Sequence, residues 1–156
     1  MLAIWYTHIT QQITGAAWQN YLAQVPEEMQ AKVMRFRRWE DAHLSLFGKL
    51  LLVKALEDWG YSGELIKSLT YSDYQRPELS VAALDFNITH SGHVVACALT
   101  EGQKIGIDVE QNKPIELDDF KNIWRADEWT AITTAADKFA MFYHLWTCKE
   151  AVIKAD

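Results

Sequence analysis

Apolar residues recur every three or four positions in parts of this chain and alternate with polar residues in others. The first pattern predicts a long helix that begins at Asp41, its expected cap, and ends at Gly60. A shorter helix is predicted to begin at Pro26, because proline suits the first turn and two glutamates follow it. Further helices are predicted around residues 117–124 and 128–135, and a last one from about residue 137 onward.

The second pattern predicts strands at residues 2–9, 86–91 and 94–99, the last of them a short apolar run. Gln75, Arg76 and Pro77 are predicted to form a turn. Residues 101–103, Glu-Gly-Gln, are predicted to be a hairpin turn, which would make 105–110 an antiparallel neighbour of 94–99. Helices together with antiparallel strands predict an α+β protein.

Length, composition and charge exclude several classes of protein. With 156 residues, 49% of them hydrophobic, the chain can form one domain or two small lobes that share a core. Its net charge of −6 argues against a general nucleic-acid-binding protein, and its apolar runs are too short for a membrane span. The first residues lack the basic region of a secretory signal. Cys97 and Cys148 lack metal-ligand spacing, so we expect reduced thiols in a cytoplasmic protein.

Three acidic residues stand where packing alone would favour apolar ones. On an extended segment 105–110, Asp108 and Glu110 share one face, with Cα atoms roughly 7 Å apart. Glu150 interrupts a stripe of aromatic residues at helical spacing, which should face the core. Burying three carboxylates needs a cation, and their hard oxygen ligands favour Mg²⁺ over zinc or copper. An edge strand in water would explain Asp108 and Glu110 equally well, and Glu150 with Lys154 is a common surface pair.

A cluster of basic residues stands out against the negative net charge. It consists of Lys32, Arg35, Arg37 and Arg38. A solvated helix face is the default explanation of such a cluster, but the same charges suit phosphate groups. His90 would ordinarily be a loop histidine. From the residues alone, we predict Mg²⁺-dependent chemistry on a compound that contains a pyrophosphate and go no further.

Five segments carry a resemblance to a known family. They are residues 35–42 (Arg-Phe-Arg-Arg-Trp-Glu-Asp-Ala), 75–77 (Gln-Arg-Pro), 86–92 (Phe-Asn-Ile-Thr-His-Ser-Gly), 106–110 (Gly-Ile-Asp-Val-Glu) and 146–154 (Trp-Thr-Cys-Lys-Glu-Ala-Val-Ile-Lys). In this order they resemble motifs of the 4′-phosphopantetheinyl transferases, specifically the long, Sfp-type branch. The last two motifs are specific when they occur together at this separation. At the turn, Gln75 and Arg76 replace the glycine and lysine of the family's Gly-Lys-Pro.

The resemblance implies an enzyme that transfers the 4′-phosphopantetheine arm of coenzyme A to a serine of an apo acyl or peptidyl carrier protein. It implies that three acids hold Mg²⁺: Asp108, Glu110 and Glu150. Glu150 or a metal-bound water would take the serine proton, and Lys154 would assist the leaving phosphate. Contacts with coenzyme A are implied for Lys32, Arg35, Arg76, Pro77, Thr89 and His90. Glu128 resembles a further acid of the family.

The resemblance also implies two pseudo-symmetric lobes, 1–104 and 105–156, with antiparallel sheets packed on helices. Because the second lobe is half as long and no strand follows the last helix, we expect it to be incomplete. We therefore expect self-association through uncovered apolar surface, and weak transfer at best. Two alternatives are an inactive coenzyme A-binding remnant that lacks the C-terminal strands, and a Mg²⁺-dependent pyrophosphohydrolase.

Overall fold

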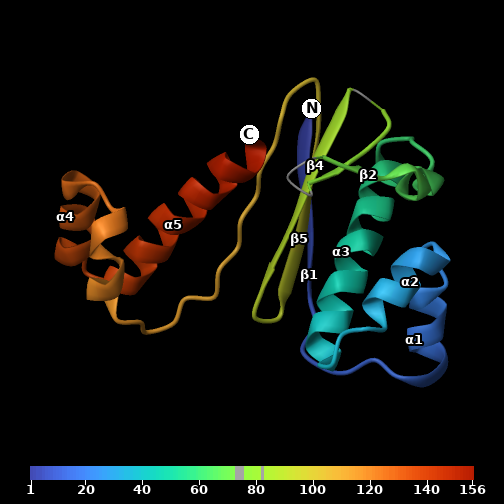
Figure 1. The fold of residues 1–156 in the computed structure, drawn as a ribbon, viewed down its shortest axis with the longest axis horizontal. Coiled ribbons are helices and arrows are strands. Elements are labelled where there is room, and N and C mark those ends of the chain that lie inside the picture. The colour runs from blue at the N-terminus through green and yellow to red at the C-terminus, as the bar shows by residue number, and fades with distance from the viewer. Residues whose placement is uncertain (73–75, 82) are drawn as a thin grey trace.

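A computed structural model describes residues 1–72, 76–81 and 83–156 of the chain (Figure 1). Strand β1 (Leu2–His8) is followed by helices α1 (Gly15–Leu22), α2 (Glu27–Val33) and α3 (Trp39–Asp58) and by the 3-10 helix η1 (Gly63–Ser68). Strands β2 (Thr70–Tyr71), β3 (Pro77–Glu78), β4 (Leu84–Ser91) and β5 (Val94–Glu101) come next. The 3-10 helix η2 (Leu117–Ile123) and helices α4 (Ala126–Thr134) and α5 (Lys138–Ala155) follow. The predicted α+β class is confirmed.

The main sheet has three antiparallel strands in the order β1-β5-β4. Strands β4 and β5 form a hairpin that turns at Gly92, whose φ of 59° lies in the region that favours glycine. Helix α3 packs on this sheet, with Leu52 and Leu56 fully buried against Phe86 of β4 and Leu99 of β5. Each such leucine contributes about 1.5–3 kcal/mol through burial. The strands predicted at 2–9, 86–91 and 94–99 and the long helix are therefore confirmed as the core of this part of the chain.

The predicted pairing of residues 105–110 with β5 is wrong. Residues 104–110, all of them described, form no strand, because β5 already has β1 on one edge and β4 on the other. The segment instead runs along β4, in the same direction, and is held by side chains. Asp85, Asn87, Thr89 and Ser91 accept hydrogen bonds from the backbone N–H groups of Ile105, Ile107, Val109 and Gln111, at 2.7, 3.0, 3.3 and 3.1 Å.

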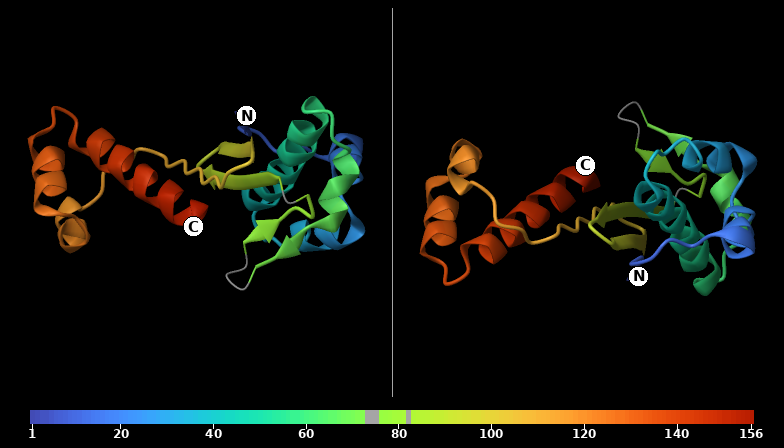
Figure 2. Two further views of the ribbon diagram at one scale, coloured as in Figure 1. Left: turned by 90° about the horizontal axis from the view of Figure 1, so that it is seen from above. Right: turned by 90° about the horizontal axis from the view of Figure 1, so that it is seen from below.

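The last helices form a second hydrophobic cluster around Trp124, Ile132 and Phe142. Helix α5 begins after Asp137, whose carboxylate accepts a hydrogen bond from Ala140 N at 2.9 Å. In both views of Figure 2, α4 lies on one side of the molecule and α1–α3 on the other, with the residues between β5 and η2 extended between them. The last predicted helix is confirmed. Ile153, which continues the predicted core-facing stripe one turn beyond Glu150, is 66% exposed, so the stripe is wrong at its end.

Several local predictions differ from the structure. Helix α3 begins at Trp39, so that Asp41 lies in its first turn, where a carboxylate also suits the helix dipole, and does not cap it. The helix predicted around 117–124 is the 3-10 helix η2, and helices α1 and η1 were not predicted. Gln75 lies outside the described residues. The pseudo-symmetry of two lobes divided at residue 104 stays a prediction. Among the described residues, no helix has the length and apolarity of a membrane span.

Candidate active site

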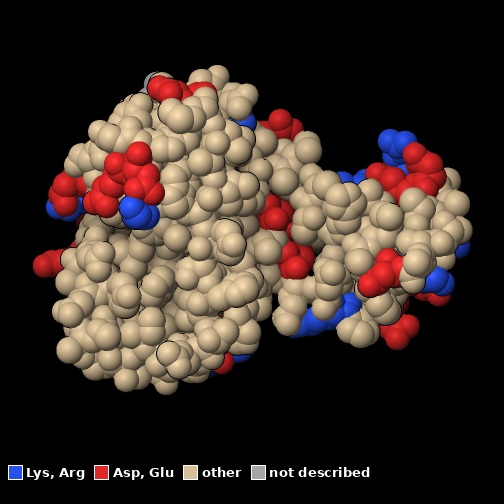
Figure 3. All heavy atoms as spheres, turned by 180° about the vertical axis from the view of Figure 1, so that it is seen from behind, with Lys and Arg blue, Asp and Glu red and all other residues tan. Residues whose placement is uncertain are grey.

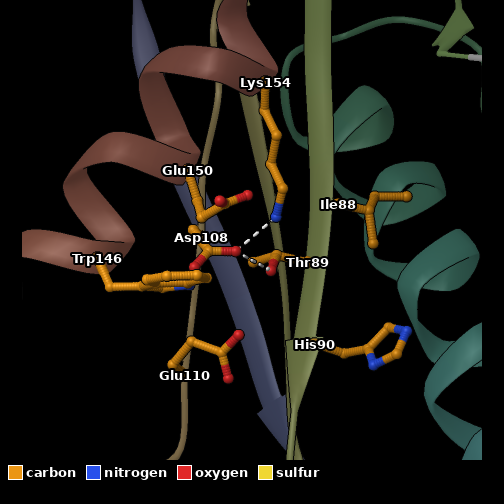
Figure 4. Close-up of a pocket in the computed structure, with 8 residues that line it drawn as sticks. All are labelled: Ile88, Thr89, His90, Asp108, Glu110, Trp146, Glu150 and Lys154. Atoms are coloured by element: carbon orange, nitrogen blue, oxygen red, sulfur yellow. Dashed lines mark hydrogen bonds and ion pairs between the residues drawn. The ribbon is translucent and has the colours of Figure 1, made fainter. Parts of the chain in front are cut away.

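Strand β4, the segment 105–111 and helix α5 enclose a cavity of about 330 Å³ (Figure 4). Its walls are Ile88, Thr89, His90, Asp108, Glu110, Trp146, Glu150 and Lys154. The structure thus brings together the three predicted metal ligands, the predicted catalytic lysine and two predicted cofactor contacts. Figure 3 shows acidic side chains in the hollow between the larger part of the molecule and the terminal helices.

Gly106 sets how closely α5 approaches the segment. A Cβ atom at this position would lie 1.9 Å from Ala151 O and 2.8 Å from Ala155 N, which are backbone atoms that have no room to move aside. The helix can therefore lie on the segment only because residue 106 has no side chain. This contact places Glu150 and Lys154 next to Asp108, two residues further along the segment.

Asp108 is the most enclosed carboxylate of the cavity, with 5% of its side chain exposed. Its Oδ1 accepts hydrogen bonds from Lys154 Nζ at 2.5 Å and from Thr89 Oγ1 at 3.3 Å. Its Oδ2 is buried and has no hydrogen-bond partner among the described residues. A buried carboxylate needs a neighbouring cation, and Lys154 supplies one. Because Oδ2 has no partner, it is the oxygen that would contact a second cation.

The other two carboxylates are less constrained. Glu110 is exposed, and its Oε2 accepts a hydrogen bond from Ser91 Oγ at 2.8 Å. Glu150 is half-buried and makes no hydrogen bond or ion pair with any described residue. In Figure 4, His90 points away from these carboxylates, on the other side of β4 from Thr89. This follows from the alternation of side chains along a strand.

The donor set fits Mg²⁺ in its chemistry. Within the described residues, no three His, Cys, Asp or Glu side chains converge closely enough to hold one ion. Asp108, Glu110 and Glu150 nevertheless line one cavity, and all of them offer the hard oxygen ligands that Mg²⁺ prefers. The buried, unpartnered Oδ2 of Asp108 is the strongest observation in favour of a cation there. The metal site stays a prediction.

A second cavity, of about 670 Å³, shares Lys154 with the first. It is lined by Ser72, Arg76, Pro77, Glu78, Asn87, Lys104, Ile153, Lys154 and Asp156. Two of the predicted cofactor-binding residues, Arg76 and Pro77, thus border it. Its volume lies in the range of small-molecule sites.

The remaining predicted residues lie elsewhere. Lys32, on the last turn of α2, lies over the ring of Tyr71 at 5.2 Å from its centroid, and Arg35 is exposed just beyond that helix. Neither residue lines the two cavities. Glu128 accepts hydrogen bonds from Lys149 Nζ at 2.9 Å and from Arg125 N at 3.0 Å, which lower the pKa of its carboxyl. Glu128 therefore stabilises α4 and α5 and lies outside the cavity that holds Asp108.

Sequence reasoning missed the side chains of β4 that hold the segment. Asp85 and Asn87 are both 9% exposed, and they orient the backbone that carries Asp108. The signal was present in the sequence, since polar residues occupy every second position from 85 to 91. Such a stripe on a buried strand indicates that its polar face has a partner.

Comparisons with known proteins agree with the motifs. Residues 12–102 match the family described as 4′-phosphopantetheinyl transferase, N-terminal, and residues 104–156 match the 4′-phosphopantetheinyl transferase superfamily. The chain is 32% identical over 142 residues to 4′-phosphopantetheinyl transferase Sfp of Bacillus subtilis (strain 168), covering 88% of this chain and 62% of that relative. A second Bacillus subtilis 4′-phosphopantetheinyl transferase is 30% identical over 157 residues, covering 98% of this chain and 69% of the relative.

A more distant relative is 4′-phosphopantetheinyl transferase gsp of Aneurinibacillus migulanus, which is 27% identical over 158 residues, covering 99% of this chain and 65% of the relative. The chain therefore spans about two thirds of the length of the curated relatives that it matches. The matched segments run through both halves of the chain and include the residues of the cavity. The chain belongs to the 4′-phosphopantetheinyl transferase superfamily.

Proposed function

We propose that this chain transfers the 4′-phosphopantetheine arm of coenzyme A to a serine of an apo acyl or peptidyl carrier protein, in a Mg²⁺-dependent reaction. One observation carries the proposal. Three carboxylates and a lysine, all from the two family motifs at 106–110 and 146–154, line one cavity of about 330 Å³. Enzymes that act on a pyrophosphate commonly use carboxylates that hold a divalent cation beside a basic side chain.

Asp108, Glu110 and Glu150 would hold the metal, with the buried Oδ2 of Asp108 as one ligand. When bound, Mg²⁺ would neutralise negative charge on the pyrophosphate of coenzyme A. Lys154 already neutralises Asp108 through its ion pair at 2.5 Å. Lys154 lines both cavities, so its ammonium group would also donate a hydrogen bond to a phosphate that lies between them.

The chain's own residues can account for the proton movements. The serine oxygen of the carrier would form a bond to the phosphorus next to pantetheine, while the bond from that phosphorus to the bridging pyrophosphate oxygen breaks. Glu150, whose carboxylate has no partner among the described residues, would accept the serine proton. Lys154 would donate a hydrogen bond or a proton to the leaving adenosine 3′,5′-bisphosphate, where negative charge develops.

The remaining contacts with coenzyme A are proposed along the path of a long ligand. Thr89 and His90 border the smaller cavity and Pro77 the larger one. Lys32 and Arg35 line neither cavity. Lys32 lies over the ring of Tyr71, whose neighbour Ser72 lines the larger cavity, so the two basic residues would meet a phosphate at the far end of the ligand. Coenzyme A carries phosphates at two places along its length, which suits this distribution of charge.

The proposal is tested by mass spectrometry of a carrier protein. The chain is incubated with coenzyme A, Mg²⁺ and an apo acyl carrier protein, and a gain of one phosphopantetheine group is expected. A carrier whose acceptor serine is replaced by alanine, and the Glu150→Gln variant, should show no gain. Release of adenosine bisphosphate without a change in the carrier would favour the hydrolase. Binding of coenzyme A without turnover would favour the inactive remnant.

We also propose that the chain acts in the cytoplasm and self-associates. Val152 and Ile153, adjacent on α5, are each 66% exposed, which leaves apolar surface on that helix in contact with water. Sedimentation velocity should show a concentration-dependent dimer for the wild type and a monomer for a Val152→Lys/Ile153→Lys variant. Identical sedimentation of the two proteins would contradict self-association through this surface.

A further inference from the structure

The guanidinium group of Arg76 contacts three separate parts of the chain. Its Nη2 donates to Asp85 Oδ2 at 2.7 Å and to Ile105 O at 2.9 Å, and its Nη1 donates to Ala155 O at 3.3 Å. Asp85 belongs to β4, Ile105 begins the segment that follows β5, and Ala155 is the last residue of α5. One side chain thus connects residues as far apart in sequence as 76 and 155.

These three parts of the chain are the ones that build the cavity. Strand β4 supplies Thr89, the segment supplies Asp108 and α5 supplies Lys154, and these side chains meet at Asp108 Oδ1. Arg76 therefore makes a second junction of the same three parts, close to the end of each. The junction holds the segment at Ile105, and the contacts in the cavity hold it at Asp108. Together they fix both the position and the direction of the segment.

Asp85 completes the junction. Its Oδ2 accepts hydrogen bonds from both Arg76 Nη2 and Ile105 N, each at 2.7 Å. The side chains of Arg76 and Asp85 are only 14% and 11% exposed. A buried pair with several hydrogen bonds holds its neighbours in one arrangement, because any shift leaves a charge or a backbone group without a partner.

The arrangement leaves little of Arg76 free to bind a ligand. Its charge faces Asp85 at 2.7 Å, and its Nε, which has no hydrogen-bond partner among the described residues, is buried where a ligand in the solvent does not reach it. A planar group with five donors in a fixed fork can serve three acceptors at once, which the ammonium group of lysine cannot do in the same geometry. The phosphate contact that the resemblance implies for this residue stays a prediction, and the contacts of its guanidinium group favour a structural role.

We propose that Arg76 and Asp85 are positioning residues, a pair that holds β4, the segment 105–111 and the end of α5 in the arrangement that forms the cavity. The effect of this pair on transfer rests on the proposed function. Its effect on the position of the segment 105–111 does not depend on that function and can be measured without turnover.

The first measurement is hydrogen exchange of the Ile107 and Val109 amides, which bond to side chains of β4. In Arg76→Lys and in Asp85→Asn, exchange at these amides should accelerate at least about tenfold relative to the wild type. Amides of Leu52 and Leu56 in the core helix α3 report global opening and should change much less. Arg125→Lys, in an exposed pair with Asp127, is the matched control and should leave all four amides unchanged.

The second measurement separates kcat from KM for coenzyme A. Both variants should lower kcat at least about tenfold and change KM less than about threefold, because the cavity is misaligned and no phosphate contact is lost. Asp85→Asn distinguishes the two roles of Arg76. If Arg76 bound a phosphate, the loss of the Asp85 charge would free its guanidinium group for the ligand, so KM would fall and kcat would stay unchanged.

Unchanged exchange at Ile107 and Val109 in both variants would overturn the proposal, whatever the kinetics. A rise in KM alone for Arg76→Lys would return Arg76 to the phosphate contacts. If the wild-type chain transfers nothing, the proposed function fails, while hydrogen exchange still decides whether the pair holds the segment.

Discussion

Lys154 Nζ lies 2.5 Å from Asp108 Oδ1, and the residues come from two family motifs that are far apart in sequence. The ion pair joins α5 to the segment 105–111 at the wall of the cavity. It places a cation on the most buried carboxylate of the site and leaves the other carboxylate oxygen without a partner. In the proposed metal site, Asp108 would therefore bind the ion through Oδ2 while Oδ1 stays paired with Lys154.

Asp108→Asn should abolish transfer and keep the fold. The amide loses the negative charge that a metal needs, but its oxygen can still accept hydrogen bonds from Thr89 and Lys154. We expect kcat to fall at least about 100-fold, as for the loss of a group that stabilises charge in the transition state. Carrier mass under single turnover measures transfer, and thermal melting measures stability. Asp127→Asn, at an exposed carboxylate, is the control, and near wild-type turnover of Asp108→Asn would exclude the metal role.

Lys154→Ala should lower kcat more than it raises KM for coenzyme A. Its charge is most useful when the leaving phosphate gains negative charge, which happens in the transition state and not in the bound substrate. Steady-state kinetics with varied coenzyme A measures the two constants separately. A matched control is Lys149→Ala, which removes a lysine of the same helix that pairs with Glu128 outside the cavity. An effect of Lys154→Ala on KM alone would make the residue a binding contact.

Gly106→Ala should separate α5 from the segment. A methyl group at this position would lie 1.9 Å from Ala151 O, so the helix must move or the backbone must bend, which costs about 1–3 kcal/mol. Transfer should fall further than stability, because Glu150 and Lys154 move with the helix. Chemical denaturation and the carrier assay measure the two effects. Gly102→Ala is a comparison that adds a methyl group in open space, at a φ of 80°, so it shows what backbone strain without a steric clash does to stability and transfer. Full activity of Gly106→Ala would show that the close contact is not needed.

The sequence was most informative where a pattern depends on local neighbours. The apolar spacing of α3 and the apolar run of β5 predicted a helix and a strand that the structure contains. Whether residues 105–110 pair with β5 depends on a strand that is distant in sequence. Strand β1 covers the second edge of β5, so no free edge is left for residues 105–110. Strand order is a property of the whole fold and is not encoded in a hairpin turn alone.

The candidate site, like the fold, was predicted only in part. The spacing of residues predicted the group of three carboxylates, and the resemblance of the motifs at 106–110 and 146–154 added a role for Lys154. The structure places all four side chains around one cavity. The role of Arg76 depends on Ala155, which is 79 residues away, and on a side-chain interaction with Asp85. No spacing in the sequence reveals that three distant parts of the chain meet at one guanidinium group.

Lys49→Met should stabilise the protein at neutral pH. The ammonium group of Lys49 is half-buried on α3 and donates hydrogen bonds to Ser45 O at 2.9 Å and Ser45 Oγ at 3.0 Å, with no carboxylate partner among the described residues. Burial, and then the positive charge of Lys32, lower the pKa of Lys49 in the folded state. Replacing a buried charge without a counterion by an apolar chain of similar length should add on the order of 1 kcal/mol to the free energy of unfolding.

The stabilising effect of Lys49→Met should depend on pH. Between the lowered pKa of Lys49 in the folded state and its ordinary value in the unfolded state, the unfolded chain binds more protons at this site, so the contribution of Lys49 to stability rises with pH. The advantage of Lys49→Met over the wild type should therefore be largest at pH 7 and shrink as the pH approaches 10.5. Urea denaturation at several pH values measures it. Lys54→Met removes an exposed lysine that pairs with Asp58 and should be slightly destabilising at pH 7. Equal stabilities of Lys49→Met and the wild type at every pH would show that burying this ammonium group carries no penalty.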